Sequence, residues 1–255
     1  MCLIALALHA HPRYRLVVTA NRDEFHARPS APASWWDDAP DLFGGRDLQQ
    51  HGSWMALARD GRWAAVTNVR RMVPPDPLAP SRGRLVAEYL RSSTSADAYV
   101  QALTADAARY AGYNLLTGDA TRVIYSSNTP HPQQQVLRPG IHAVSNASLD
   151  TPWPKLLRLR TGLARWCAAG DEDFTTLFSQ LADDAPARDD ELPDTGVGLE
   201  MERFLSSPFI RSDRYGTRSC TVLAVTTTGA VHYHERRYGP QGVYQGETVE
   251  YLQLA

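Results

Sequence analysis

The amino-acid sequence predicts an α+β fold, a four-layer αββα sandwich of mainly antiparallel sheets. Short apolar runs follow one another in pairs that are joined by tight turns, which is typical of antiparallel strands. Two blocks with helical spacing interrupt these runs, and each block has to cover one face of a sheet to bury its apolar side. The chain has 255 residues, of which 43% are hydrophobic. This size and composition allow a sizeable core and indicate one domain spanning residues 1–255.

The first two apolar runs, residues 3–8 and 15–20, are separated by a polar turn that contains proline. They predict a β-hairpin in the core. The segment 25–43 that follows is rich in Pro, Ala, Asp and Trp. Its composition indicates a loop that is packed by its own aromatic residues, Trp35 and Trp36.

The middle of the chain combines further strands with the first helical block. Tyr99, Leu103 and Ala107 recur at the spacing of one helix face, and Ser81 stands where another helix would begin. We expect, in chain order, strands at 53–57 and 63–68, a proline-rich loop at 74–80, helices at 81–90 and 95–110, and strands at 113–116, 122–126 and 141–145.

The second helical block comes before the last strands. Leu156, Leu159 and Leu163 share one side of a helix that we expect at 152–167. Beyond it we expect a helix at 174–182, a solvated loop over the acidic run 183–194, a hairpin of strands at 221–226 and 230–234, and an edge strand at 247–254. Two helical blocks between groups of strands are the order that a four-layer arrangement requires.

The charge of the chain is nearly balanced. Its formal net charge is −2, and a dedicated surface for nucleic acid or an anionic membrane would need an excess of basic residues. The first residues carry no basic segment ahead of their apolar run, and no apolar stretch approaches the roughly 20 residues of a membrane-spanning helix. We therefore expect no signal peptide, no integral membrane segment and no nucleic-acid partner.

The three cysteines, Cys2, Cys167 and Cys220, are far apart and form no CxxC pair. This odd, scattered set argues against a disulfide framework or a zinc ribbon and favours a reducing compartment, the cytoplasm. His232 and His234 share one face of a strand, a spacing that suits a metal, but no third ligand is evident. We expect both histidines at the surface, Cys167 and Cys220 as small buried hydrophobes, and neither a metal nor a cofactor.

Cys2 is the first candidate for chemistry. A side chain as small as cysteine at position two permits removal of Met1, which leaves a thiol and a free α-amine on one residue. The α-amine has an unperturbed pKa of roughly 7.7–8.0, so it can accept a proton near neutral pH. The thiolate is the nucleophile, and one residue would thus supply nucleophile and base. The alternative is a chance cysteine in a buried strand.

Four polar residues, Asn-Arg-Asp-Glu at 21–24, directly follow the second apolar run. A hairpin would bring them beside Cys2, because it places the start of one strand next to the end of the other. Such residues at the end of a buried strand are costly unless they are paired. A charged site beside Cys2 and a solvated turn both explain them.

Together these features resemble the NRDE family, also called the transport and Golgi organisation two family. The resemblance begins with Met-Cys, an apolar strand and Asn-Arg-Asp-Glu-Phe-x-x-Arg-Pro at 21–29, and it spans essentially the whole chain. Further matching motifs follow in order: Gly44-Gly45-Arg46-Asp47, Gly52-Ser53-Trp54, Thr67-Asn68-Val69-Arg70, Ser81-Arg82-Gly83, Tyr113-Asn114-Leu115, Ser145-Asn146 and Tyr215-Gly216-Thr217-Arg218-Ser219. Several ordered motifs are far more specific than any one of them.

The NRDE family is in turn similar to N-terminal-nucleophile hydrolases of the choloylglycine hydrolase and penicillin acylase kind. The resemblance implies the fold of those enzymes, with Cys2 as the nucleophile and its α-amine as the base. The supporting catalytic residues that it implies are Arg22, Asp23, Asn68, Asn146 and Arg218.

The resemblance also implies a role for each supporting residue. Asp23 would orient the α-amine, and Arg22 would favour the thiolate. Asn68 and Asn146 each lie just past a strand, and one or both would donate to an oxyanion. Arg218 would stand near the nucleophile at the start of the last hairpin. Arg22 and Asp23 are adjacent and point in different directions in an extended chain, which leaves one of them to face the nucleophile.

Two further motifs have both structural and functional interpretations. Gly-Gly-Arg-Asp at 44–47 indicates either a tight turn that holds an ion pair or a plain structural turn, which is the simpler interpretation. Ser-Arg-Gly-Arg at 81–84 precedes a helix and could bind an anion, since helix N-termini present free N–H groups. An N-cap with solvated arginines is the simpler interpretation of the second motif.

Two functions remain open at this point. The first is an amidohydrolase or acyltransferase that acts on a small amide or thioester through a Cys2 acyl-enzyme. The second is a non-catalytic protein for binding or trafficking of haem, acyl-CoA or lipid on the same scaffold. The NRDE resemblance suggests the second, and Trp35 and Trp36 could line its apolar site. A structural role in the secretory pathway follows only from the family's name.

Overall fold

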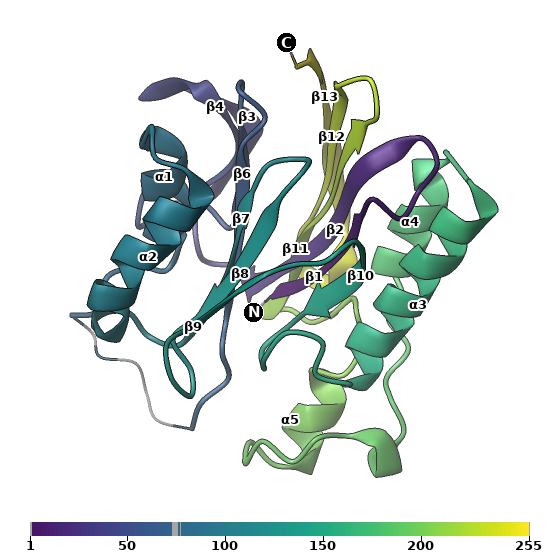
Figure 1. Cartoon of the computed structure of the whole chain (residues 1–255). Coiled ribbons are helices and arrows are strands. Elements are labelled where there is room, and N and C mark those ends of the chain that lie inside the picture. Colours follow the sequence, from purple (N-terminus) through teal and green to yellow (C-terminus); the bar gives the residue numbers. More distant parts are fainter. Residues whose placement is uncertain (1, 73–75, 77, 255) are drawn as a thin grey trace.

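The computed structural model describes residues 2–72, 76 and 78–254, which form two sheets stacked between two layers of helices (Figure 1). The first sheet contains six strands in the order β10 (Gly140–Val144), β1 (Cys2–Leu8), β2 (Tyr14–Phe25), β11 (Tyr215–Thr226), β12 (Ala230–Tyr238) and β13 (Tyr244–Gln253). The second contains seven, in the order β3 (Ser30–Trp36), β4 (Ala39–Asp47), β5 (Met55–Ala58), β6 (Trp63–Asn68), β7 (Tyr113–Gly118), β8 (Val123–Ser127) and β9 (Gln133–Val136). All these strand neighbours are antiparallel.

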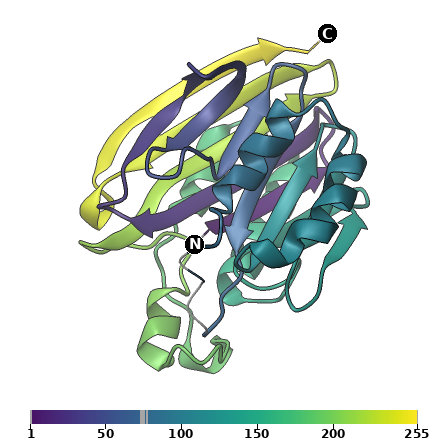
Figure 2. The ribbon, with the colours of Figure 1, turned by 90° about the vertical axis from the view of Figure 1, so that its left-hand side faces the viewer.

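Helices cover the outer face of each sheet, so the expected αββα sandwich is confirmed. The view in Figure 2 shows α1 (Gly83–Arg91) and α2 (Ala96–Asp106) on the second sheet. The first sheet is covered by α3 (Pro154–Ala169) and α4 (Phe174–Leu181). Beyond the end of the sheets at which the chain begins lies α5 (Leu199–Phe204). Within the described chain, no helix combines the length and the apolar character needed to cross a membrane.

Strand β1 shows why this sequence forms stacked layers. Its alternate residues Ile4 and Leu6 belong to the core between the two sheets, whereas Leu3 and Ala5 belong to the core beneath α3 and α4. All four are at most 2% exposed. A strand that is buried on both faces is a continuous apolar run. The sequence therefore identifies the strand but does not reveal which side chains face the other sheet.

The expectation of a loop at 25–43 is wrong, because most of this segment forms the β3–β4 hairpin. β3 is an edge strand of the second sheet, and an edge strand tolerates a proline such as Pro32. Trp36 is 2% exposed in the core beneath α1. The Arg59 guanidinium lies over the Trp35 ring, 3.8 Å from the ring centroid. These two side chains therefore do not form the apolar site expected for haem, acyl-CoA or lipid.

Other elements differ in extent. β2 runs on to Phe25, so the residues 21–24 lie inside the strand rather than after it, and β11 begins at Tyr215 rather than at 221. β9 is exposed along its whole length and α5 is short, so neither carries a clear apolar period. The loop expected at 74–80 lies partly outside the described residues. The remaining expected strands and helices are present, with ends shifted by a few residues.

Two cysteines and a pair of histidines were expected to be buried and exposed, respectively. Cys167 and Cys220 are buried, as expected. His232 and His234 are half-buried rather than at the surface, because both contact the rings of Phe174 and Tyr251. The described residues contain no group of three or more His, Cys, Asp or Glu side chains that could hold a metal ion.

Candidate active site

Cys2 is the first residue of β1 and lies at the end of the first sheet. It is directly opposite Arg22 of β2, and Ser145, just past β10, donates from Oγ to the Cys2 carbonyl oxygen at 3.1 Å. The Cys2 side chain is partly exposed, whereas Cys167 of α3 and Cys220 of β11 are buried in the core between the helices and the first sheet. Cys2 is therefore the thiol that a substrate can reach.

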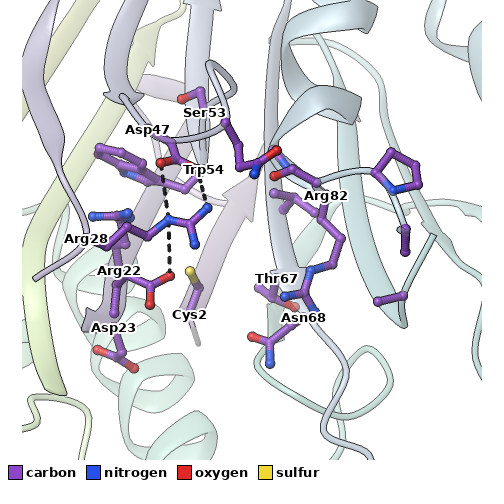
Figure 3. A pocket seen from close by; sticks show the side chains of 18 of the residues that line it. Cys2, Arg22, Asp23, Arg28, Asp47, Ser53, Trp54, Thr67, Asn68 and Arg82 are labelled. Atoms are coloured by element: carbon purple, nitrogen blue, oxygen red, sulfur yellow. Dashed lines mark hydrogen bonds and ion pairs between the residues drawn. The ribbon is translucent and has the colours of Figure 1, made fainter. Parts of the chain in front are cut away.

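A cavity of about 350 Å³ opens beside Cys2 at this end of the molecule (Figure 3). Its walls come from segments that are far apart in the sequence: the ends of β1, β2 and β6, the stretch 47–54, and Asp76 together with residues 79–83. Small-molecule sites have volumes of about 300–1,000 Å³. The cavity therefore has the size of a site for a small molecule.

Arg22 and Asp23 leave β2 in opposite directions, because successive strand residues alternate between the faces of a sheet. Arg22 shares the face of Cys2, and its guanidinium lies over Trp54, 4.1 Å from the ring centroid. Thr217 donates from its hydroxyl to the Asp23 carboxylate at 2.7 Å. Both Arg22 and Asp23 line the cavity, so the structure brings them together with Cys2.

Burial governs the protonation of Cys2 and its neighbours. It raises the pKa of the Cys2 thiol, and while the charge of Asp23 acts in the same direction, that of Arg22 acts in the opposite one. Burial also raises the pKa of Asp23, against the charge of Lys155 and the hydrogen bond from Thr217. The thiol is therefore protonated at neutral pH unless a base adjoins it.

Lys155 is a residue of this region that sequence reasoning missed. It lies in the first turn of α3, is 2% exposed, and its pKa is lowered to about 8 by burial, with Asp23 acting in the opposite direction. Arg70 and Glu202, which form an ion pair at 2.7 Å, also affect this pKa: the charge of Arg70 lowers it and that of Glu202 raises it. Lys155 stands four residues before Leu159 on the apolar face of the predicted helix. A lysine on the apolar face of a helix requires a buried acid as its partner. Its place on that face is the sequence signal that could have identified Lys155 as part of a buried charged site.

Asn68 and Asn146 form one unit at the end of β6. Asn146 donates from Nδ2 to the backbone oxygen and to Oδ1 of Asn68, each at 3.0 Å. This contact fixes the Asn68 amide so that its Nδ2 remains a donor. Asn68 lines the cavity and lies in Figure 3 on the opposite side of Cys2 from Asp23. Asn146 is not among the residues that line the cavity, so its contact with the site runs through Asn68.

Hydrogen bonds between the two sheets hold this arrangement. Thr67 of β6 donates from Oγ1 to the Ser145 carbonyl oxygen at 2.5 Å, and Asn114 of β7 donates from Nδ2 to Thr67 Oγ1 at 3.0 Å. Ser145 in turn donates to the Cys2 carbonyl oxygen. A continuous set of buried polar contacts therefore fixes the start of β1 relative to the end of β6, where Asn68 lies.

Arg82, just before α1, completes the cavity wall. It lies in Figure 3 on the same side of Cys2 as Asn68. Its Nη1 donates to a backbone carbonyl oxygen at 3.3 Å, and it forms no ion pair with a carboxylate of the described chain. Burial lowers its pKa, and the charge of Cys2 acts in the opposite direction. The expectation of solvated arginines is thus wrong for Arg82 and correct for Arg84, which is exposed and paired with Glu88 at 2.8 Å.

Two glycine-containing motifs of the sequence meet at Arg82. Ser53 donates its N–H to the Gly83 carbonyl oxygen at 3.1 Å. A Cβ atom at Gly52 would lie 2.4 Å from the Gly83 carbonyl carbon, so only glycine permits this approach of the two backbones. The contact places Arg82 against the cavity and gives both motifs a common structural cause.

The ion pair expected inside the Gly-Gly-Arg-Asp motif is not formed. Arg46 and Asp47 are successive residues of β4 and point in opposite directions. Arg46 pairs with Asp38 at 2.7 Å, whereas Asp47 pairs with Arg28 at 2.5 Å (Figure 3). Arg28 also lies 3.9 Å from Glu24, so in this part of the cavity wall one guanidinium lies between two carboxylates.

Arg218 is not brought to this cavity. Its Nη1 donates to the carbonyl oxygens of Phe25, His26 and Arg28 at 3.0, 3.3 and 3.1 Å, and its Nη2 donates to Ser30 Oγ at 3.2 Å. It therefore fastens the connection between β2 and β3 to β11. The place expected for it near the nucleophile is not observed, because β2 lies between its strand and β1.

Comparison with known proteins identifies relatives along the whole chain. The model of the family described as Transport and Golgi organisation 2 matches residues 1–240. The mouse Transport and Golgi organization 2 homolog is 29% identical over 273 aligned residues that cover 98% of each chain. The human homolog is 30% identical with the same coverage, and the bovine homolog is 32% identical over 92% of each chain.

Two solved hydrolases have a similar fold. The C2A mutant of the conjugated bile acid hydrolase from Clostridium perfringens aligns with a TM-score of 0.56 over 100% of this chain and 92% of its own. The Caenorhabditis elegans ortholog of the N-acylethanolamine-hydrolyzing acid amidase aligns with a TM-score of 0.51 over 88% and 92%. Both are 9% identical in sequence, so the likeness concerns the fold, and the expected N-terminal-nucleophile-hydrolase-like architecture is confirmed. From the family match along residues 1–240 and the relatives in three mammals, this chain belongs to the Transport and Golgi organisation 2 family.

Proposed function

We propose that this protein is an N-terminal-cysteine amidohydrolase or acyltransferase that acts on a small amide or thioester through a Cys2 acyl-enzyme. The observation that carries the proposal is the position of Cys2, whose thiol borders a cavity with Asn68 and Arg82 on the other side. The fold shared with two hydrolases supports it, and one of these hydrolases also has a cysteine as its natural second residue.

The α-amine of Cys2 is the base in this proposal, so Met1 has to be removed first. Burial raises the pKa of the thiol, and the thiol therefore needs a proton acceptor beside it. An α-amine with an unperturbed pKa of roughly 7.7–8.0 can take that proton near neutral pH. The buried carboxylate of Asp23 would hold the resulting ammonium, which is the role that its place beside Cys2 supports.

The reaction then proceeds in two steps. The thiolate attacks the substrate carbonyl carbon, a C–S bond forms, and the electron pair of the C=O bond moves to oxygen. Asn68 Nδ2 and Arg82 donate to this oxyanion. When the C=O bond forms again, the C–N or C–S bond of the substrate breaks, and the leaving group takes the proton from the α-ammonium.

The second step releases the acyl group. Water gives a proton to the α-amine and adds to the acyl-enzyme, the bond to Cys2 breaks, and the thiol recovers its proton as the acid leaves. In acyl transfer, an amine or an alcohol takes the place of water. The geometry of Cys2, Asn68 and Arg82 serves both outcomes, because both pass through the same oxyanion.

Substitution of the thiol tests this proposal. Wild type, Cys2→Ala and Cys167→Ala are compared on a panel of acyl-CoA thioesters and N-acyl amides, with release of free thiol or amine as the readout. Cys167 is a matched control because its thiol is buried and outside the cavity. We expect turnover by wild type and Cys167→Ala and none by Cys2→Ala. Undiminished turnover by Cys2→Ala would contradict the proposal.

A further inference from the structure

A second cavity, of about 460 Å³, lies between β3 and the part of the first sheet formed by β11, β12 and β13. It shares Arg22 and Trp54 with the cavity of Cys2, so this stacked pair is the partition between the two spaces. The reaction proposed at Cys2 assigns no role to the second cavity.

The strand register relates the second cavity to the nucleophile. Cys2 is opposite Arg22, Arg22 is opposite Ser219, and Ser219 is opposite Arg237, across β1, β2, β11 and β12. Directly opposite residues project from the same face of a sheet. Neighbouring strands are about 4.8 Å apart, so the backbone of Ser219 lies about 10 Å from that of Cys2. A ligand in the second cavity therefore lies about two strands away from the thiol.

The arginines of the second cavity lack acidic partners. None of the three forms an ion pair with a carboxylate in the part of the chain that the structure describes, and their side chains donate to neutral acceptors such as Ser30 Oγ and Thr248 Oγ1. By contrast, the buried Arg70 is paired with a glutamate at 2.7 Å. The three arginines that line the second cavity are Arg22, Arg218 and Arg237.

Glu235 is the carboxyl group that lines this cavity. It is 0% exposed, its Oε1 accepts from the Ala33 N–H at 2.8 Å, and its Oε2 has no hydrogen-bond partner among the described residues. The hydroxyl of Ser219 is likewise buried without a partner there. Burial raises the pKa of Glu235 to about 7, with Arg237 and Arg22 acting in the opposite direction. Among the described residues that line it, the cavity thus sets at most one negative charge against three positive ones.

We propose that the second cavity binds a small molecule through a phosphate group. Guanidinium groups bind phosphate oxygens in bidentate geometry, and three arginines against at most one carboxylate match a dianion. Buried polar atoms usually have partners, so the free oxygens of Glu235 and Ser219 mark places where polar groups next to the phosphate would be bound. This site goes beyond the proposed hydrolase function and does not depend on it.

Titration calorimetry with glycerol 3-phosphate at low ionic strength tests the proposal, with acetate at the same ionic strength as the control. Wild type is compared with Arg237→Ala and Arg236→Ala. Arg236 is a matched control because it neighbours Arg237 in β12, projects from the opposite face and pairs with Glu247. We expect saturable binding by wild type and Arg236→Ala, and a loss of affinity of roughly tenfold or more in Arg237→Ala.

Three further arms keep this result unambiguous. Arg237→Lys retains the positive charge and should recover part of the affinity, which separates a lost contact from a misfolded variant. Cosedimentation with vesicles containing phosphatidic acid, against phosphatidylcholine alone, distinguishes a lipid headgroup from a free phosphate ester. Cys2→Ala should bind as wild type does, so a failed hydrolase reaction leaves this test intact. Absence of saturable binding to both phosphate probes, or equal losses in Arg236→Ala and Arg237→Ala, would overturn the proposal.

Discussion

The two cavities on either side of Arg22 and Trp54 both contain arginine side chains, but the arginines differ in whether a carboxylate pairs with them. On the side of Cys2, Arg28 lies between two carboxylates and is fully paired. On the other side, Arg237 donates to a hydroxyl group and has no acidic partner in the described chain. A paired guanidinium fixes a wall, whereas an unpaired one keeps its charge for a ligand. The first cavity combines Cys2 and the paired Arg28 with Arg82, which has no acidic partner among the described residues and can meet an oxyanion. The second cavity instead gathers three arginines without acidic partners there, which suits an anionic ligand.

Asn68→Ala should separate the two cavities most strongly. Loss of one oxyanion donor lowers kcat by about 100- to 1,000-fold, while the affinity of the second cavity for phosphate should not change. Steady-state kinetics on the best acyl donor, together with the phosphate titration, measures both quantities. Equal effects on turnover and phosphate affinity would mean that the cavities are not separate, and an unchanged kcat would exclude Asn68 as a donor.

Glu235→Gln tests whether the carboxyl group of the second cavity is buried without a charged partner. Burial raises the folded pKa of Glu235 from 4.5 to about 7. A group with a raised folded pKa adds stability that is fully present below its unfolded pKa and is lost as pH rises through its folded value. Glutamine has no charge to bury. The unfolding free energy of the variant relative to wild type should therefore rise by about 3 kcal/mol between about pH 4.5 and pH 8.

Urea unfolding of both proteins at several pH values measures this difference. The control is Glu247→Gln, because Glu247 is partly exposed and forms a surface ion pair, which contributes little to stability. A stability difference for Glu235→Gln that is constant with pH would show that Glu235 is charged throughout and already paired.

Arg82→Ala should have the smallest effect. Its charge, unpaired beside Cys2, should favour an anionic reagent over a neutral one. We expect the ratio of Cys2 alkylation rates with iodoacetate and iodoacetamide to fall by about fivefold in Arg82→Ala, since a charge interaction there contributes on the order of 1 kcal/mol. The paired, exposed Arg84 provides the control, and Arg84→Ala should leave the ratio unchanged. A ratio that is the same in Arg82→Ala and wild type would remove Arg82 from the site.

Local patterns in the sequence were sufficient for much of the fold. Paired apolar runs, and the helical spacing of residues such as Leu156 and Leu159, are patterns that a few consecutive residues are enough to show. The strands and helices that these patterns predict are present. The edge strands β3 and β9 depend instead on a neighbouring strand for their pairing and carry proline or polar residues. Composition therefore indicated a loop where β3 lies and gave no sign of a strand where β9 lies.

The sequence predicted those residues of the candidate site that lie at the ends of recognisable strands. Cys2 and Asn68 line the same cavity because Cys2 is the first residue of β1 and Asn68 is the last residue of β6, at the same end of the sandwich. Arg82 and Lys155 enter through the packing of α1 against the 52–54 stretch and of α3 against the first sheet, and such packing joins distant parts of the chain. Arg218 was misplaced for the same reason, since the order of strands across a sheet is not the order along the sequence.

The most direct test of the account examines the N-terminal peptide of the mature protein. The protein is incubated with a turned-over acyl donor, quenched in acid, digested and analysed by tandem mass spectrometry. The account predicts a peptide that begins at Cys2 and carries the acyl group on that residue, with Cys167 and Cys220 unmodified. A peptide that still begins with Met1, or an acyl group found on another cysteine, would contradict it.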